Sequence, residues 1–293
     1  MRDQPAPFEL QDVGLRTMAV RSMGLRPVPS VSPARVWASG YPEQDLVGVA
    51  AVWVGDYASG WVRTKPASRG LGHGVALLDH MLEYARRSRC TAFRPIGSVS
   101  GESAAWLSRH GGRRRSCIRE FEAPLEAVGV ICQRIWPRVA PSVPESAELV
   151  TLGQAAQRGY LDELSGFVAP AIGGRPQRWL ERVATSLKRG DGEVDPDVSG
   201  VLLVDGRARG ALLIGYRETS GWWVTESIVV APQLRGGWAN AWLRLHCTRA
   251  ALATGRTPTL RFQARDDQTD TLRFARHISA RLIEERFLME VLL

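Results

Sequence analysis

The sequence predicts an α/β protein with two similar domains in one chain. Its 293 residues exceed the usual size of a single hydrophobic core. Two short motifs also recur: PASRG at 66–70 returns as PQLRG at 232–236, and SRHGG at 108–112 returns as ARHIS at 275–279. Because the spacing between the two motifs is almost the same in both halves, the pattern indicates an internal duplication.

The expected boundary between the halves lies near residue 140. The segment WPRVAPSVPES at 136–146 has three prolines and few apolar residues, which is typical of a linker. We therefore expect an N-terminal domain at 1–140 and a C-terminal domain at 146–293. The first half is shorter before its repeated motif, so we expect one helix there to be missing or reduced.

The elements of the two halves follow from hydrophobic periodicity and turn residues. Asp205-Gly206 predicts a tight hairpin, since both residues readily adopt positive φ. In the second half we expect strands at 147–152, 198–204, 207–218, 221–232, 259–265 and 281–293, and helices at 154–167, 175–187, 239–253 and 270–277. In the first half we expect strands at 36–40, 46–54 and 60–66, and a helix at 75–87.

The formal net charge of +8 raises nucleic acid as a partner. All but two of the 38 basic residues are arginines, which indicates a compositional bias. The densest run, Arg113 to Arg115, lacks the interleaved aromatic residues of a base-stacking surface. We therefore favour a solvated basic face over nucleic-acid binding.

The patterns of cysteine, histidine and apolar residues argue against disulfides, metal sites and membrane spans. The four cysteines form no CxxC pair, and His73 and His80 have no third ligand at metal-site spacing, so we expect neither disulfides nor a metal. No apolar stretch has the length of a signal peptide core or a membrane span. We expect a soluble, cytoplasmic protein.

A glycine-rich loop in the first half is the strongest chemical signal. Gly70, Gly72 and Gly74 follow Arg69 and directly precede an amphipathic helix. Free amides and partial positive charge at a helix N-terminus bind phosphates, and glycines let the backbone approach an anion closely. The loop lacks the GKS/T ending of a Walker loop and the GxGxxG of a Rossmann fingerprint. The alternative interpretation is a tight strand-to-helix turn with no ligand.

With a proline three residues before Arg69 and a strand before that, the segment resembles the pyrophosphate loop of the GCN5-related N-acetyltransferases (GNAT superfamily). The order of elements in both halves is similar to that family too. The resemblance implies two domains, each with a mixed, mostly antiparallel twisted sheet flanked by helices, and acetyl-CoA as acetyl donor. The cofactor-binding residues it implies in the first half are Arg69, Gly70, Leu71, Gly72, His73, Gly74 and Val75.

The second half carries a shorter version of this loop. RGGWANAWL at 235–243 matches the family pattern with one residue deleted. The resemblance implies that Arg235, Gly236 and Gly237 contact the cofactor, although the compressed loop offers fewer amides. Four tryptophans, at 222, 223, 238 and 242, flank this loop as core residues or as the wall of an acceptor pocket.

The candidate catalytic residue is Glu226, six residues before Pro232. Family members commonly use a carboxylate on this strand as general base and a tyrosine on the late short helix as acid. Simple alternation puts Glu226 on one strand face with Ile228 and Val230, where a carboxylate requires a cleft. The alternative is a surface carboxylate paired with an arginine. The first half has Gly60 at this position, and neither half has the tyrosine.

The resemblance thus implies an N-acetyltransferase, with an acetyl group moving from acetyl-CoA to a primary amine by direct attack in a ternary complex. Tandem members of the family commonly have one catalytic and one structural half. Two other functions stay open: a non-catalytic CoA-binding or interaction protein, and aminoacyl transfer from charged tRNA. The amine acceptor, the catalytic half, the general acid and the oligomeric state are not encoded in any motif.

Overall fold

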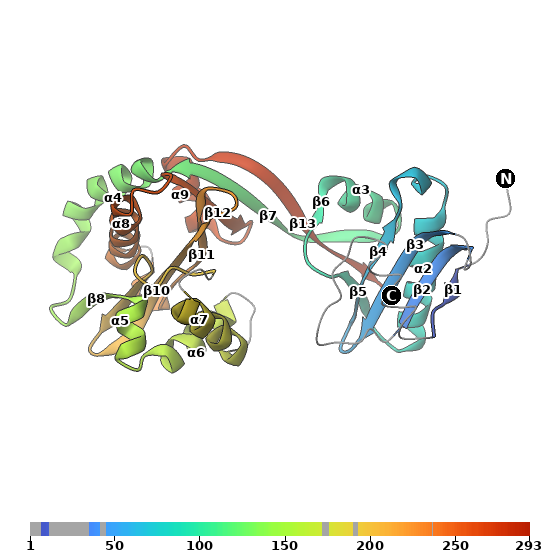
Figure 1. The fold of residues 1–293 in the computed structure, drawn as a ribbon, viewed down its shortest axis with the longest axis horizontal. Helices are drawn as coiled ribbons and strands as arrows, with labels where there is room; N and C mark the ends of the chain where they lie inside the picture. The colour runs from blue at the N-terminus through green and yellow to red at the C-terminus, as the bar shows by residue number, and fades with distance from the viewer. Residues whose placement is uncertain (1–6, 12–34, 42–44, 172–175, 190–192, 236) are drawn as a thin grey trace. The chain divides into compact units, whose positions relative to one another are not determined.

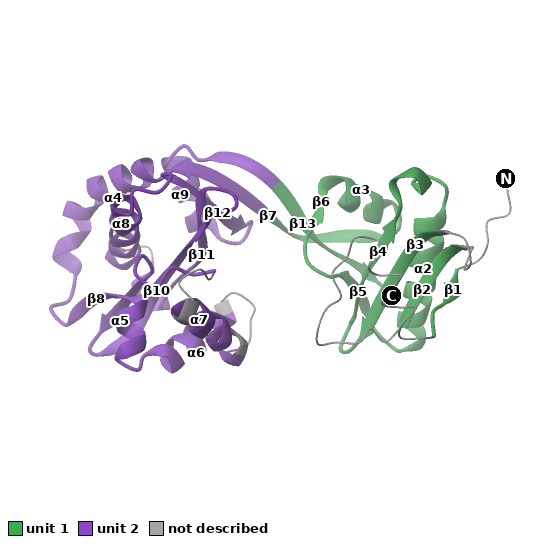
Figure 2. Cartoon of the chain, in the orientation of Figure 1, with its two compact units in different colours: residues 1–118, 285–293 green, residues 119–284 purple. Residues whose placement is uncertain are grey.

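A computed structural model of the chain describes residues 7–11, 35–41, 45–171, 176–189, 193–235 and 237–293. By their contacts the residues divide into two compact units, coloured separately in Figure 2. Unit 1 comprises residues 1–118 and 285–293, and unit 2 comprises residues 119–284. Figure 1 labels the helices and strands used below.

Unit 1 is built on a sheet with the strand order β1-β2-β3-β4-β5-β13. The pairs are antiparallel except for β4 and β5, which are parallel. The strands are β1 (Phe8–Glu9), β2 (Arg35–Tyr41), β3 (Asp45–Val54), β4 (Ala58–Thr64), β5 (Ala92–Pro95) and β13 (Arg281–Leu292), and the helices are α2 (His73–Arg87) and α3 (Gly101–Arg109).

Helices α2 and α3 cover one face of this sheet. The apolar residues of α2 recur with helical period, and Leu77, Leu78 and Met81 are buried against the sheet with Phe93 of β5. The helix ends at Arg87 as predicted, with Arg86 and Arg87 in its last turn, and begins at His73, two residues before the predicted start. Gly72 caps its N-terminus with φ of 90°. The helix therefore begins directly at the glycine loop.

Unit 2 has a sheet with the strand order β7-β12-β11-β10-β9-β8, in which β11 and β12 are parallel. Its strands are β7 (Gly112–Pro124), β8 (Ala147–Thr151), β9 (Gly200–Val204), β10 (Arg207–Arg217), β11 (Trp222–Val230) and β12 (Thr259–Arg265). Residues 112–118 of β7 belong to unit 1, and residues 281–284 of β13 belong to unit 2. Its helices are α4 (Leu125–Val139), α5 (Leu152–Gln157), α6 (Leu161–Ala171), α7 (Pro176–Arg189), α8 (Trp238–Ala253) and α9 (Thr269–His277).

The two faces of this sheet are covered by different helices. Residues of α4, α8 and α9 share a core with Trp223, which is fully buried, whereas residues of α5, α6 and α7 form a second core with Val229. The hairpin predicted at Asp205-Gly206 is confirmed, with φ of 51° and 68° at the two residues. The predicted mixed, mostly antiparallel sheets flanked by helices are also confirmed.

The compact units divide the chain differently from the repeated halves 1–140 and 146–293. The last strand of the chain, β13, pairs with β5 of unit 1, with Val291 opposite Phe93. Strand β7 of the first half is the neighbour of β12 in unit 2. The last strand of the second half thus lies in the sheet of unit 1, and the last strand of the first half lies beside β12. For this reason residues 119–140 belong to the same compact unit as most of the second half.

The segment 136–146, expected to be a linker, is partly helical. Its first residues form the last turn of α4, and Trp136 packs against Trp242 of α8, with ring centroids 5.7 Å apart. Pro137 lies inside the helix near its C-terminal end, where few following residues depend on the hydrogen bond it removes. The packed indole explains why the prolines do not make this segment a free linker.

Two negative findings apply to the described residues. None of their helices combines the length and the apolar character that crossing a bilayer requires. None of their His, Cys, Asp and Glu side chains gather in a group of three that could hold a metal ion. All four cysteines are buried and unpaired with one another.

Candidate functional site

The loop between β4 and α2 turns sharply with the help of two glycines. After β4 the chain makes a 3-10 turn at Pro66–Ser68 and is then extended at Arg69, with φ of −69° and ψ of 146°. Gly70 and Gly72 follow with φ of 80° and 90°, a left-handed region that side chains disfavour. The pattern of alternating glycines therefore has a conformational cause at these two positions.

This geometry leaves a run of backbone amides free. Within the described residues, the N–H groups of residues 70–74 have no hydrogen-bond acceptor. The first donors of α2 are those of Val75 and Ala76, which reach the carbonyl oxygen of Gly72 at 3.0 and 3.1 Å. No acidic residue lies in the first turn of α2. The loop has the donors and the local charge that bind a phosphate group.

The side chains around these amides also fit an anion. The Arg69 guanidinium is exposed and has no carboxylate within 4 Å among the residues described. The His73 ring is held away from the amides, since its Nδ1 lies 2.6 Å from the buried Ser39 Oγ on β2. At Gly74 an added Cβ would meet only ordinary contacts with Thr64 and Trp106 at 3.6 Å. Leu71 is 54% exposed.

Strands β4 and β5 diverge next to this loop. They pair in parallel only at the start of β4, from Ala58 opposite Phe93 to Gly60 opposite Pro95. Residues 61–64 of β4 continue toward the loop without a β5 partner in the described chain. The same occurs in unit 2, where Trp223 and Val224 pair with β12 and residues 225–230 of β11 do not. Each unit thus has an unpaired strand edge leading to its loop.

The loop of unit 2 enters its helix in a different way. Its 3-10 turn at Pro232–Leu234 and the extended Arg235, with φ of −68° and ψ of 148°, repeat the first loop closely. Gly237 then caps α8 in an extended conformation, with φ of −120°, in place of a left-handed glycine. Gly236 lies outside the described residues. The loop is one residue shorter than in unit 1, as its sequence predicts.

Glu226 is the extra residue of a β-bulge in β11. Ser227 pairs with Leu213 of β10 and Thr225 pairs with Ile214, so Glu226 has no partner in the ladder. A bulge changes the direction of the side chains that follow it. Ile228 and Val230 therefore pack toward the α8 side, while Glu226 faces Arg182 of α7. Simple alternation placed these three residues on one face, which is wrong because it does not allow for the bulge.

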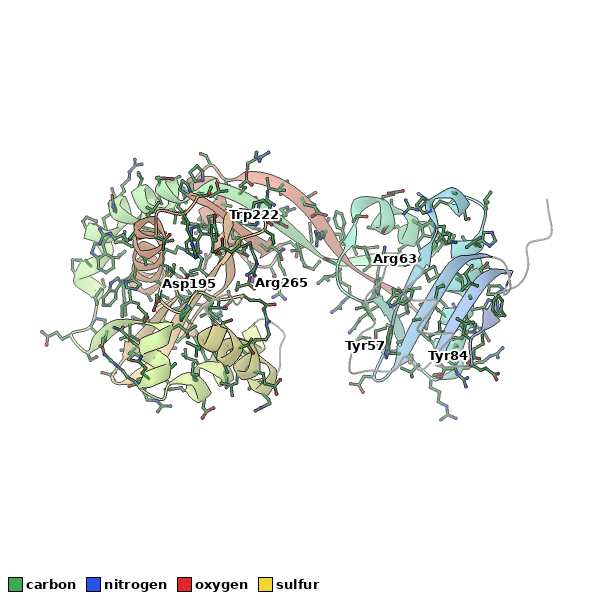
Figure 3. The ribbon with its side chains drawn as sticks, viewed as in Figure 1. Tyr57, Arg63, Tyr84, Asp195, Trp222 and Arg265 are labelled. Carbon is green, nitrogen blue, oxygen red and sulfur yellow. The ribbon has the colours of Figure 1, made fainter. Side chains whose placement is uncertain are left out.

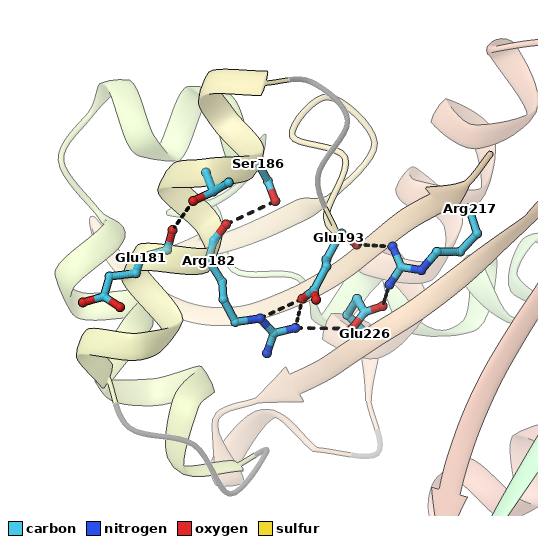
Figure 4. Close-up of polar contacts among 7 residues, drawn as sticks. Glu181, Arg182, Ser186, Glu193, Arg217 and Glu226 are labelled. Carbon is cyan, nitrogen blue, oxygen red and sulfur yellow. Dashed lines mark hydrogen bonds and ion pairs between the residues drawn. The ribbon is translucent and has the colours of Figure 1, made fainter. Parts of the chain in front are cut away.

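The carboxylate of Glu226 lies in a small ionic network (Figure 4). Arg217 donates a hydrogen bond to Glu226 Oε1, and Arg182 Nη2 lies 3.8 Å from Oε2. Arg182 also donates to Glu193 Oε2 at 2.7 Å, and Arg217 donates to the Glu193 carbonyl at 3.1 Å. Arginine pairing, the alternative considered for this residue, is therefore present.

Burial raises the pKa of the Glu226 carboxyl, whose side chain is only 21% exposed. Arg217 opposes this shift, and the nearby Glu193 adds to it. A carboxyl with a raised pKa is a stronger base than an exposed one. The arrangement can therefore accept a proton, provided that the arginine contacts leave one oxygen lone pair available.

Unit 1 has no side chain at the corresponding place. A Cβ on Gly60 would lie 2.3 Å from the Ala51 carbonyl oxygen, so the backbone excludes any larger residue. The β3–β4 register is also continuous, without a bulge. The short helices α3 and α9 contain no tyrosine and end at or next to His110 and His277.

Sequence reasoning missed the residues around Glu226. Arg217 faces Trp222 across the hairpin, and Arg182 and Glu193 come from α7 and the segment after it. The hairpin register puts Arg217 opposite Trp222, four residues before Glu226, so counting along the hairpin does not predict that the two side chains meet. Of the tryptophans beside the loop, Trp223 and Trp238 are core residues, and Trp222 lies under the Arg261 guanidinium at 3.5 Å.

Several solved structures have a similar fold. A GCN5-related N-acetyltransferase from Sphaerobacter thermophilus matches with a TM-score of 0.57 at 15% identity, over 98% of this chain and 96% of that chain. A tandem GNAT protein from the clavulanic acid biosynthesis pathway gives 0.57 at 16% identity over 97% of both chains. A probable N-acyltransferase from Enterococcus faecalis V583 gives 0.59 at 14% identity, over 98% of this chain and 71% of that chain.

No family model matches the sequence, and no curated protein sequence does. At 14 to 16% sequence identity, a structural match shows that the fold is shared and nothing finer. The matches cover nearly the whole chain, including both units with their diverging parallel strands. The chain therefore has the GNAT fold, in the tandem form with two GNAT-like domains.

Proposed function

We propose that this protein is an acyl-CoA-dependent N-acetyltransferase that moves an acetyl group from acetyl-CoA to a primary amine. The observation that carries the proposal is the row of free amides at residues 70–74, at the N-terminus of a helix whose first turn has no acidic residue. Several free amides in one exposed loop favour a group with several anionic oxygens, such as a diphosphate.

Acetyl-CoA would be held by the backbone more than by side chains. The amides of residues 70–74 and the exposed Arg69 suit the diphosphate, and residues 61–64 of β4 suit the amide groups of the pantetheine arm. In unit 2 the corresponding parts are Arg235, Gly237 and the free edge of residues 225–230. We expect tighter binding in unit 1, because its longer loop has the two left-handed glycines.

Glu226 is the proposed general base. The amine must lose a proton as its nitrogen attacks the thioester carbonyl, the new C–N bond forms, the C–S bond breaks, and the departing thiolate takes up a proton. Glu226 accepts the amine proton directly or through water, and burial makes its carboxylate basic enough to do so. Because Gly60 leaves no room for a carboxylate in unit 1, the proposal assigns the chemistry to unit 2.

The test is release of CoA thiol in the presence of a panel of primary amines. The four cysteines are buried, and burial raises the pKa of Cys247 to about 12, so the folded protein contributes little to a thiol reagent signal. Amine-dependent thiol release that depends on Glu226 supports the proposal. No release with any amine, together with tight acetyl-CoA binding, contradicts the enzymatic part alone.

A non-catalytic CoA-binding protein is the second candidate. It is favoured by the contacts of Glu226 with two arginines, since Arg217 donates a hydrogen bond to Oε1 and Arg182 lies 3.8 Å from Oε2. The absence of a tyrosine from α3 and α9 points the same way. This candidate predicts acetyl-CoA binding by calorimetry without turnover, and Arg217→Gln would leave the protein inactive instead of changing its pH dependence.

A further inference from the structure

A cavity of about 320 Å³ lies in unit 1, outside the loop and the carboxylate described above. It has the size of a small-molecule site, for which about 300 to 1,000 Å³ is typical. It lies beside the place where β4 and β5 still pair, since Ser59 is opposite Arg94. The side chains that matter below are Tyr57, Arg94, Ile96, Arg115 and Leu288.

The cavity belongs to the sheet face that α2 does not cover. Phe93 of β5 and Met289 and Val291 of β13 are buried in the core with α2. Strand residues alternate between faces, so Arg94 and Glu290 point to the opposite side. Among the described residues that line the cavity, only Met289 also belongs to the hydrophobic core under α2.

Three arginines on this face share one carboxylate. Glu290 is 6% exposed and accepts hydrogen bonds from Arg94 at 3.2 Å and from Arg113 at 2.8 Å, while Arg115 Nε lies 3.6 Å away. These contacts hold the pKa of Glu290 below its ordinary value, chiefly through the bond from Arg113. Among the described residues none of the three arginines has a second carboxylate within 4 Å. One negative charge therefore faces three positive charges.

The two arginines that line the cavity have donors to spare. Arg94 uses Nε on Glu290, which leaves both of its terminal nitrogens unbonded in the described chain. Its guanidinium plane is held by the Tyr57 ring, 4.1 Å from the ring centroid. Arg94 is 31% exposed and Arg115 43% exposed, so solvent reaches both. Figure 3 marks Tyr57 on unit 1.

We propose that this cavity binds a small acidic molecule through its carboxylate or phosphate group. Arg94 and Arg115 hold the anionic group, because paired guanidinium donors match the geometry of both oxyanions. Tyr57, Ile96 and Leu288 contact the apolar part of the molecule. Glu290 pairs with the same two arginines and so competes with the ligand for them, without contacting the ligand itself. The inference does not depend on the acetyltransferase function.

The test measures anion binding to the full-length protein by calorimetry and thermal shift, with inorganic phosphate, succinate and the uncharged succinamide as probes. We expect phosphate or succinate to bind and to raise Tm, and succinamide to do neither. Arg94→Gln and Arg115→Gln should each weaken binding at least tenfold. Arg109→Gln, an exposed arginine on α3, is the matched control and should leave affinity unchanged.

Glu290→Gln separates a ligand site from a purely structural ion cluster. It removes the internal competitor for the arginines, so we expect a lower Tm without ligand and anion binding at least fivefold tighter than in the parent protein. Absence of binding in both folded proteins would overturn the proposal. Binding that survives the Arg94 and Arg115 substitutions but is lost in Gly70→Asp would also overturn it, because the anion would then occupy the glycine loop.

Discussion

Gly70→Asp tests the anion loop with little disturbance of the fold. Gly70 has φ of 80°, and a Cβ there meets no atom within 4 Å. Asp and Asn tolerate this left-handed conformation better than other residues. The substitution therefore places a carboxylate beside the free amides of residues 70–74 without a steric clash, at a φ whose strain the control Gly70→Asn shares. We expect the folded protein to form normally.

The expected loss of acetyl-CoA affinity in Gly70→Asp follows from the exposure of the loop to water. Gly70, Leu71 and Gly72 are exposed, so the dielectric constant is close to that of water. Two unit charges 4 Å apart in water repel by about 1 kcal/mol, and a diphosphate with two charges doubles this to about 2 kcal/mol. Since about 1.4 kcal/mol corresponds to tenfold in affinity, Gly70→Asp should weaken acetyl-CoA binding about 30-fold.

Calorimetric titration with acetyl-CoA measures this difference. Gly70→Asn is the shape control and should lose much less affinity, because it adds no charge. Gly111→Asp is the position control, since Gly111 also lies in unit 1 with φ of 83° and an open Cβ position. Equal losses in Gly70→Asp and Gly111→Asp, or unchanged affinity in Gly70→Asp, would show that the loop amides do not bind the diphosphate.

Three further predictions concern unit 2. Glu226→Gln should lower turnover more than tenfold with the fold intact, and equal rates would remove Glu226 from the mechanism. Arg217 lowers the pKa of Glu226, so Arg217→Gln should raise that pKa and move the acidic limb of the kcat/KM profile to higher pH; an unmoved limb contradicts the assignment. Trp223 is fully buried and its Nε1 has no partner in the described chain. By urea unfolding, Trp223→Ala should cost about 3 to 5 kcal/mol and Trp223→Phe clearly less.

Local patterns were sufficient to predict most elements of the fold. The period of Leu77, Leu78 and Met81 marks the buried face of α2, and Asp205-Gly206 marks the hairpin, because both signals depend on residues close in sequence. The glycines of the loop were expected to let the backbone approach an anion closely, and two of them, Gly70 and Gly72, have left-handed φ. These features require no knowledge of distant contacts.

The features that sequence could not predict depend on pairing between distant segments. The exchange of β13 into unit 1 joins Val291 to Phe93, almost two hundred residues away, and no local pattern encodes that choice of partner. The bulge at Glu226 shifts register by one residue, which reverses the face that periodicity assigns. The cluster on Glu290 likewise needs three strands to meet. The role of the candidate site residues remains a prediction.

The most direct measurement is a crystal structure of the protein with acetyl-CoA. We expect the diphosphate oxygens within hydrogen-bonding distance of the amides of residues 70–74, and the pantetheine arm along residues 61–64 of β4. Acetyl-CoA bound elsewhere in unit 1, or absent from it at saturating concentration while those amides remain free, would show that the glycine loop is not the cofactor site.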